Sequence, residues 1–121
     1  MQNYCAVVAA GSLAVVSINL GLPLVYRKIR RNCWYGYRLN RYVMTDDDIW
    51  YEVNALGGLH VVIGGVGLLV IAGFSLLFAG NPQAQSTILF ITMLLTVAGL
   101  AYSMFKTIRL SCRLAEEKGL R

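Results

Sequence analysis

The chain has 121 residues, of which 57% are hydrophobic and only 14% are charged. Soluble domains carry about 25% charged residues, and a mean hydropathy of +0.58 indicates a membrane protein. Three apolar windows, about residues 4–26, 53–79 and 86–105, reach the roughly 20 residues needed to cross a bilayer core. We therefore expect an all-α fold with three membrane spans in a single domain, residues 1–121, and no soluble catalytic domain.

The basic residues predict how these spans are oriented. All eleven Lys and Arg residues lie between the first two spans or after the third, which three spans bring to one side of the membrane. Cytoplasmic loops retain Lys and Arg, so we expect an inner (plasma) membrane protein with its N-terminus outside and its C-terminus in the cytoplasm. The basic run at 27–31 is interpreted as a topology anchor facing anionic lipids of the inner leaflet. It is too short to predict a nucleic-acid partner.

The first span is expected to remain as an uncleaved helix, because it is longer than the apolar core of a secretory signal and no basic residue precedes it. Asn19 lies about 8 Å inside the cytoplasmic boundary, at 1.5 Å per residue. A polar amide at this depth is expected to face protein and to form a hydrogen bond with another helix, with a ligand contact as the alternative.

The segment 32–58 differs from the rest of the chain, because it holds most of the acidic residues and many of the aromatic ones. Aromatic residues alternate with Arg38 and Arg41, which is typical of a belt at headgroup level. Gly36, between two tyrosines, indicates a turn or a close backbone approach. We expect the chemistry of the protein to lie in this segment.

A long helical pattern runs from the three aspartates 46–48 to about Ala79 and exceeds what one span requires. Its first turns are expected to project beyond the membrane, with Thr45 as the cap and Asp48 bonding back to it. Adjacent aspartates fan out around a helix axis, so this interpretation is favoured over a metal site. Glu52 also lies on the projecting turns.

Two patterns of small and polar residues follow on the same helix. Trp50, Asn54 and Gly58 recur every four residues and form one stripe. Glycines also repeat at a spacing of seven, which lets a neighbouring helix approach closely; the pairs are Gly57 with Gly64 and Gly58 with Gly65. His60, near the inner boundary, is either a packed hydrogen-bonding group or a titratable site.

The third span carries one continuous face of small and polar residues, which predicts the side turned toward other helices. Its members are Thr92, Thr96, Gly99, Ser103 and Thr107. The tail at 116–118 is expected to be a frayed, solvated helix end. Faces of this kind also predict a homo-oligomer or a subunit of a larger complex.

The chain lacks the spacing patterns of enzymes and metal sites. Cys5, Cys33 and Cys112 show no zinc-type spacing, and no disulfide is expected because Cys5 is predicted on the opposite side of the membrane from the other two. There is no P-loop, no H-E-x-x-H and no Ser-His-Asp set. We expect a protein that is not an enzyme and that binds no cofactor or metal.

The order of the motif residues resembles the SdpI family of bacterial integral membrane proteins. That family has a Pro-Asn pair, a G-x-R-T element, and W-x-x-x-N-x-x-G-G leading into a membrane helix. The matching residues here run from Asn32 to about Gly73 and include Asn32, Gly36-Tyr37-Arg38, Trp50, Asn54 and Gly57-Gly58. Arg31 replaces the family proline, and Leu39 replaces the threonine.

The resemblance implies a function as well as a fold. Better-known family members have an additional N-terminal membrane half, and they are implied to act in immunity against a membrane-active peptide toxin and in sequestering a repressor. The resemblance carries over Gly36, Arg38, Trp50, Asn54 and Gly58 as signature positions. We expect a binding or protective module whose motif, at the cytoplasmic face, recognises a peptide, a lipid headgroup or a membrane-protein partner.

A physical account of the motif follows from its charges. The loop around Arg38 is expected to fold back onto the projecting turns, with Arg38 paired to Glu52 or Asp48. Trp50 and Asn54 would then form the floor of a polar pocket. The alternatives are an accessory subunit of a larger membrane complex, a holin-like pore former, and a transporter, which the lack of a second membrane carboxylate disfavours.

Overall fold

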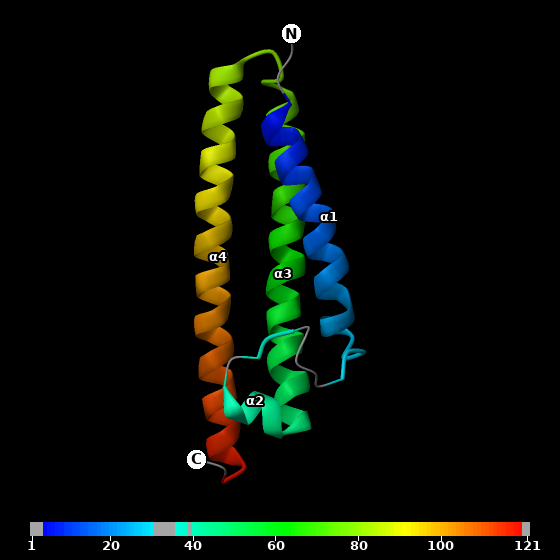
Figure 1. Ribbon diagram of the computed structural model, residues 1–121, viewed down its shortest axis with the longest axis vertical. Coiled ribbons are helices and arrows are strands. Elements are labelled where there is room, and N and C mark those ends of the chain that lie inside the picture. The colour runs from blue at the N-terminus through cyan, green and yellow to red at the C-terminus, as the bar shows by residue number, and fades with distance from the viewer. Residues whose placement is uncertain (1–3, 31–35, 39, 120–121) are drawn as a thin grey trace.

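The computed structural model describes residues 4–30, 36–38 and 40–119, so Asn32 lies outside the described part. The described residues form four helices and no strand. The helices are α1 (Cys5–Val25), α2 (Arg41–Thr45), α3 (Asp47–Leu76) and α4 (Pro82–Glu117). Figure 1 shows three long helices side by side, with the short α2 across one end, near the C-terminus.

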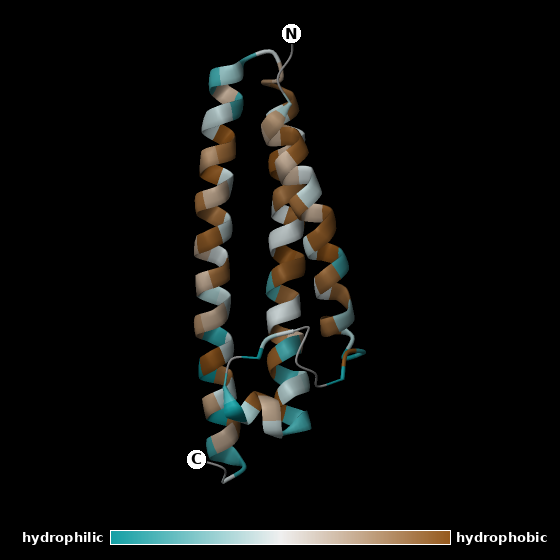
Figure 2. Cartoon of the chain, viewed as in Figure 1, coloured by the Kyte–Doolittle hydropathy of each residue, from teal (hydrophilic) through white to brown (hydrophobic). Residues whose placement is uncertain are grey.

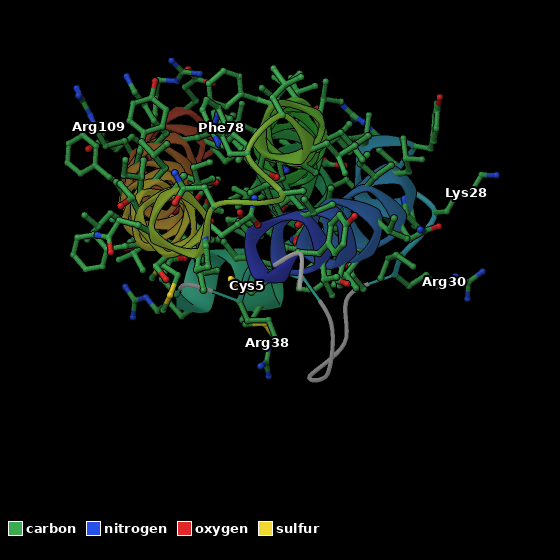
Figure 3. All side chains as sticks on the ribbon, turned by 90° about the horizontal axis from the view of Figure 1, so that it is seen from above. Cys5, Lys28, Arg30, Arg38, Phe78 and Arg109 are labelled. Atoms are coloured by element: carbon green, nitrogen blue, oxygen red, sulfur yellow. The ribbon has the colours of Figure 1, made fainter. Side chains whose placement is uncertain are left out.

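The three long helices are each apolar enough to cross a membrane, so this is an all-α, multi-pass membrane protein. Their apolar residues fill the middle of the bundle in Figure 2, and polar residues gather around α2 and at the start of α4. Figure 3 views the bundle along its axis and shows Arg109 on one side of it and Lys28 and Arg30 on the opposite side.

α1 and α3 pack closely because glycines remove the side chains between them. A Cβ added at Gly58 would lie 2.7 Å from the Leu24 Cβ and 2.8 Å from the Gly21 carbonyl oxygen. One at Gly65 would lie 2.7 Å from the side chain of Ile18. The expected role of Gly58 and Gly65 in close helix approach is therefore seen in the geometry.

Asn19 does not join this interface. Its side chain is exposed, and its Nδ2 donates to the Val15 carbonyl of its own helix at 2.8 Å. The expectation of a bond to another helix is wrong, because Ile18 and Gly21 face α3 and Asn19 is turned about 100° from Ile18. Bonding to the carbonyl four residues earlier satisfies the amide without a partner helix.

The start of α3 also differs from the prediction. Asp46 is the cap, and its Oδ1 accepts from the Ile49 N–H at 3.1 Å. Thr45 ends α2, and its hydroxyl donates to the Arg41 carbonyl. This five-residue helix was not predicted, and the side chain of Asn40 caps it by accepting from the Val43 N–H. An N-cap needs extended backbone, which Asp46 has and the helical Thr45 lacks.

α4 is much longer than the predicted span and reaches both ends of the bundle. It begins at Pro82, after the Asn81 cap. At its other end Lys118 forms ion pairs with Asp46 at 2.9 Å and with Asp48 at 2.9 Å. The tail at 116–118 is exposed, as expected for a solvated end, but it is not frayed, because the ion pairs hold Lys118 against the start of α3.

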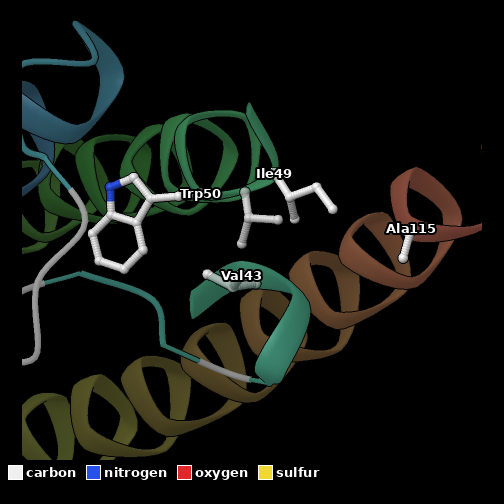
Figure 4. Close-up of a cluster of buried hydrophobic side chains, with 5 residues drawn as sticks. Val43, Ile49, Trp50 and Ala115 are labelled. Carbon is white, nitrogen blue, oxygen red and sulfur yellow. The ribbon is translucent and has the colours of Figure 1, made fainter. Parts of the chain in front are cut away.

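A small apolar core lies at the α2 end, where α2, α3 and α4 meet. Trp50 and Ile49 of α3 and Val43 of α2 are fully buried, together with Ala115 of α4 (Figure 4). This core extends beyond the predicted third span, and it explains why α4 continues so far. Burying an aromatic and two branched side chains stabilises the junction by about 5–9 kcal/mol, at roughly 1.5–3 kcal/mol per side chain.

The opposite end is held by a buried polar side chain that the sequence analysis missed. Gln85 of α4 is fully buried. Its Nε2 donates to the Ser75 carbonyl at 2.7 Å, and its Oε1 accepts from the Ala6 N–H at 3.1 Å. One glutamine thus ties the first turn of α1 to the last turns of α3.

Candidate functional site

Asn54 is the centre of the motif region. It is only 2% exposed. Its Oδ1 accepts from the Tyr37 N–H, and its Nδ2 donates to the carbonyls of Tyr37 at 3.3 Å and of Trp50 at 3.0 Å. The loop folds back onto the first turns of α3, as the sequence predicted, and the Asn54 amide holds it there by the backbone.

Two of the motif glycines are required by this arrangement. Gly36 has φ +107, which side chains rarely adopt, and a Cβ there would lie 2.6 Å from the Asn54 Oδ1. A Cβ at Gly57 would lie 2.7 Å from the Tyr37 ring. Both positions let the loop backbone and the tyrosine ring rest directly on α3.

Trp50 and Asn54 do not form the floor of an open pocket, so that expectation is wrong. The Trp50 ring is fully buried, and its Nε1 donates to the Ile29 carbonyl at 3.0 Å. This bond fixes the chain just after α1, and the Asn54 bonds fix it again at Tyr37. The W-x-x-x-N part of the motif therefore positions the loop between the first two spans.

The acids proposed as partners of Arg38 take other cations. Glu52 pairs with Arg27 at 2.7 Å, and Asp48 pairs with Lys118. Figure 3 shows the Arg38 side chain extending away from the helices. Ion pairs from the first turns of α3 thus connect that helix to the ends of α1 and α4.

Tyr37 points into the bundle and is not part of an interfacial belt. Its hydroxyl lies 2.8 Å from the Ser103 Oγ, and the same Oγ lies 2.8 Å from the Nδ1 of His60. A hydroxyl has one proton and can also accept, so Tyr37 donating to Ser103 and Ser103 donating to His60 satisfies all three groups. This chain of hydrogen bonds joins the loop to α3 and α4.

A groove of about 270 Å³ lies beside this cluster, mainly between α3 and α4. Tyr37, His60 and Ser103 line it, together with apolar residues and Ser17 of α1. Other lining residues are Gly64, Gly67, Leu68, Thr96, Gly99 and Leu100. The groove is therefore apolar, with a hydroxyl and imidazole cluster contributed by the loop, α3 and α4.

The glycines of the groove differ from those of the α1–α3 interface. A Cβ at Gly64, Gly67 or Gly99 would meet nothing within 4 Å among the described residues. The prediction that Gly64 allows close helix approach is therefore wrong within this chain. Gly64 and Gly99 instead leave open space in the groove between α3 and α4.

The predicted face of α4 turns inward only in part. Thr92, Ser103 and Thr107 are buried, whereas Thr96 is half-buried and Gly99 is exposed in the groove. The buried threonine hydroxyls donate to carbonyls of their own helix. Within the described residues, Ser103 is the one member of this face whose side chain bonds another element. Ser111, which the prediction missed, accepts from the Asn40 side chain at 2.7 Å.

Comparison with known proteins agrees with the motif and with the fold. No curated protein and no solved structure matches the chain. A family model, described as the SdpI/YfhL protein family, matches residues 28–105, well over half of the chain. The matched region begins just after α1 and includes the loop, α2, α3 and the membrane part of α4. The chain therefore belongs to the SdpI/YfhL protein family.

Proposed function

We propose that the protein is a non-enzymatic binding module that protects its membrane against membrane-active peptides, or signals their presence. The groove between α3 and α4 is the binding site in this proposal. The observation that carries it is the pairing of an open apolar groove with three unfilled glycines and a polar cluster. An apolar peptide segment can approach the glycine backbone closely there and find hydrogen-bonding groups at Tyr37, His60 and Ser103.

The motif has a supporting role in this mechanism. Asn54 and Trp50 hold the loop, and the loop places Tyr37 against Ser103 at the groove. Replacing these motif residues would disturb the fold and the groove together. A sharper test changes the groove without touching the motif.

The test is the viability of cells challenged with membrane-active peptides. Cells expressing the wild type are compared with cells expressing Gly67→Leu or Gly99→Leu at matched membrane levels. A leucine at either position enters the groove, and its Cβ meets no atom within 4 Å. We expect protection by the wild type and its loss in both variants.

Gly73→Leu is the matched control. Gly73 lies on α3 like Gly67 and also has no atom within 4 Å of an added Cβ, but it does not line the groove. Protection should survive this change. If the wild type does not protect, the immunity proposal fails, and stoichiometric co-purification of a larger membrane protein would favour the accessory-subunit alternative.

The proposed orientation places the motif at the cytoplasmic face of the inner membrane, with the N-terminus outside. The support is the absence of Lys and Arg from the turn between α3 and α4 and their abundance at the α2 end. In a cysteine-free background, an impermeant maleimide should label Gln83→Cys in intact spheroplasts and Lys118→Cys only after lysis. The reverse pattern would refute this orientation.

A further inference from the structure

Three basic side chains follow one another where α4 leaves its apolar stretch. Lys106, Arg109 and Arg113 line a shallow groove on the surface of α4, with Leu56 of α3 also contributing. All three basic residues are exposed. Glu116 is the acidic residue in the lining, so positive charge prevails.

Aromatic rings lie one turn closer to the apolar stretch, beneath two of these cations. The Lys106 Nζ lies 5.6 Å from the ring centre of Tyr102, and the Arg109 Cζ lies 5.6 Å from that of Phe105. Both rings are 57% exposed. A long basic side chain over an exposed ring is typical of the boundary between headgroups and acyl chains.

Two other cations at this end of the bundle form ion pairs within the chain. Arg27 pairs with Glu52, and Lys118 pairs with two aspartates. Lys106 and Arg109 form no ion pair within the part of the chain that the structure describes. Arg113 reaches Glu117 only at 4.0 Å, with both side chains largely exposed, and such pairs contribute little.

We propose that this surface is a specific binding site for one anionic glycerophospholipid. The phosphate oxygens lie between Lys106 and Arg109, with Arg113 adding charge, and an acyl chain runs along Tyr102 and Phe105. The exposed rings favour a lipid over a soluble acidic partner, because their faces are reached from within the bilayer. This site is separate from the groove of the proposed function and does not rest on it.

The experiment is native mass spectrometry of the full chain in neutral detergent, titrated with phosphatidylglycerol or phosphatidylcholine. The site variant is Lys106→Gln/Arg109→Gln. The control is Lys28→Gln/Arg30→Gln, which removes the same charge from the opposite side of the bundle (Figure 3). Circular dichroism establishes that both variants are folded.

The wild type should bind phosphatidylglycerol in preference to phosphatidylcholine. The site variant should lose at least about tenfold in affinity for phosphatidylglycerol, because each basic residue at an anionic surface contributes a factor of about five. The control should stay within about twofold. Equal losses in both variants would indicate a diffuse field and overturn the site. So would no lipid preference, or displacement of the lipid by a soluble polyglutamate peptide.

Discussion

Glycines lie on two faces of α3, and they have a different structural role on each face. Toward α1, Gly58 and Gly65 have no room for a methyl group, and backbone meets backbone. Toward the groove, Gly64 and Gly67 face open space. α1 also packs on α3 far more extensively than α4 does. One face of the helix therefore packs tightly against α1, and the other lines an open groove.

The largest expected loss of stability comes from adding a side chain on the face of α3 that packs against α1. Gly58→Leu places a Cβ 2.7 Å from Leu24 and 2.8 Å from a backbone oxygen that cannot rotate away. We expect a loss of more than about 3 kcal/mol of stability, at or beyond the usual cost of overpacking. Gly64→Leu should change stability by less than about 1 kcal/mol. Thermal unfolding in detergent measures both, and similar losses would remove the distinction between the faces.

The next largest effect should separate two asparagines. Asn54→Ala leaves the partly buried backbone groups of Tyr37 without their partner, at about 1–3 kcal/mol for each group, so we expect a loss of about 2–4 kcal/mol. Asn19→Ala removes an exposed amide that bonds only its own helix, and should cost less than about 0.5 kcal/mol. Equilibrium unfolding in mixed detergent tests the pair. Equal costs would contradict the central role given to Asn54.

A smaller effect is expected at the bond between the loop and α4. Ser103→Ala removes the partner of both Tyr37 and His60 and should cost about 1–2 kcal/mol. Thr96→Val, on the same face, loses only a bond within its own helix and serves as the control. Hydrogen exchange should rise at residues 36–38 in the first variant and not in the second. Unchanged exchange in both would mean that the loop does not depend on α4.

The smallest effect concerns pH at the exposed end of α4. The hydrogen bond from Lys118 holds the pKa of Asp46 below its ordinary value, with a further contribution from the Ile49 N–H. Bonds to Asp48 and then Asp46 raise the pKa of Lys118. The stability that the Asp46 carboxylate contributes is present above about pH 3.9 and is lost as pH falls through the lowered pKa of Asp46. The stability that the Lys118 ammonium contributes is present below about pH 10.4 and is lost as pH rises through the raised pKa of Lys118.

Lys118→Gln should therefore remove the loss of stability at alkaline pH and reduce the loss of stability at acid pH. Part of the acid loss remains because the Ile49 N–H still bonds Asp46. Melting temperatures of wild type and variant across pH, compared as differences, check this. Asp47→Asn is the control, because the change removes one charge nearby, whereas the ion pairs of Lys118 are with Asp46 and Asp48. If the melting temperatures of wild type and Lys118→Gln fall equally at alkaline pH, the ion pairs of Lys118 with Asp46 and Asp48 do not form in solution.

Much of the architecture could be predicted because it follows from hydrophobicity and residue size. The apolar windows gave the three spans, and the glycine spacing gave the interface at Gly58 and Gly65. The order of Gly36, Trp50 and Asn54 gave the family, and the charges predicted the folded-back loop, although Glu52 and Asp48 pair with Arg27 and Lys118. These features depend on local pattern or on a motif, which a single sequence displays.

The remaining features depend on which groups meet in space. Asn19 and Asn54 are chemically identical, and only packing decides that one bonds its own helix and the other holds the loop. Gly58 and Gly64 are likewise indistinguishable until the direction of α4 is known. Tyr37 resembled a belt residue because its partner, Ser103, is 66 residues away. Gln85 was missed because it lies at the edge of the apolar window, where a polar residue is ordinarily solvated.

Gln85 has a consequence for the order in which the chain enters the membrane. The Ala6 N–H belongs to the first turn of α1, where helices leave donors without a partner. Its acceptor lies on α4, which is synthesised after α1 and α3, and the same side chain also needs the Ser75 carbonyl of α3. This junction therefore forms only after all three spans have been inserted.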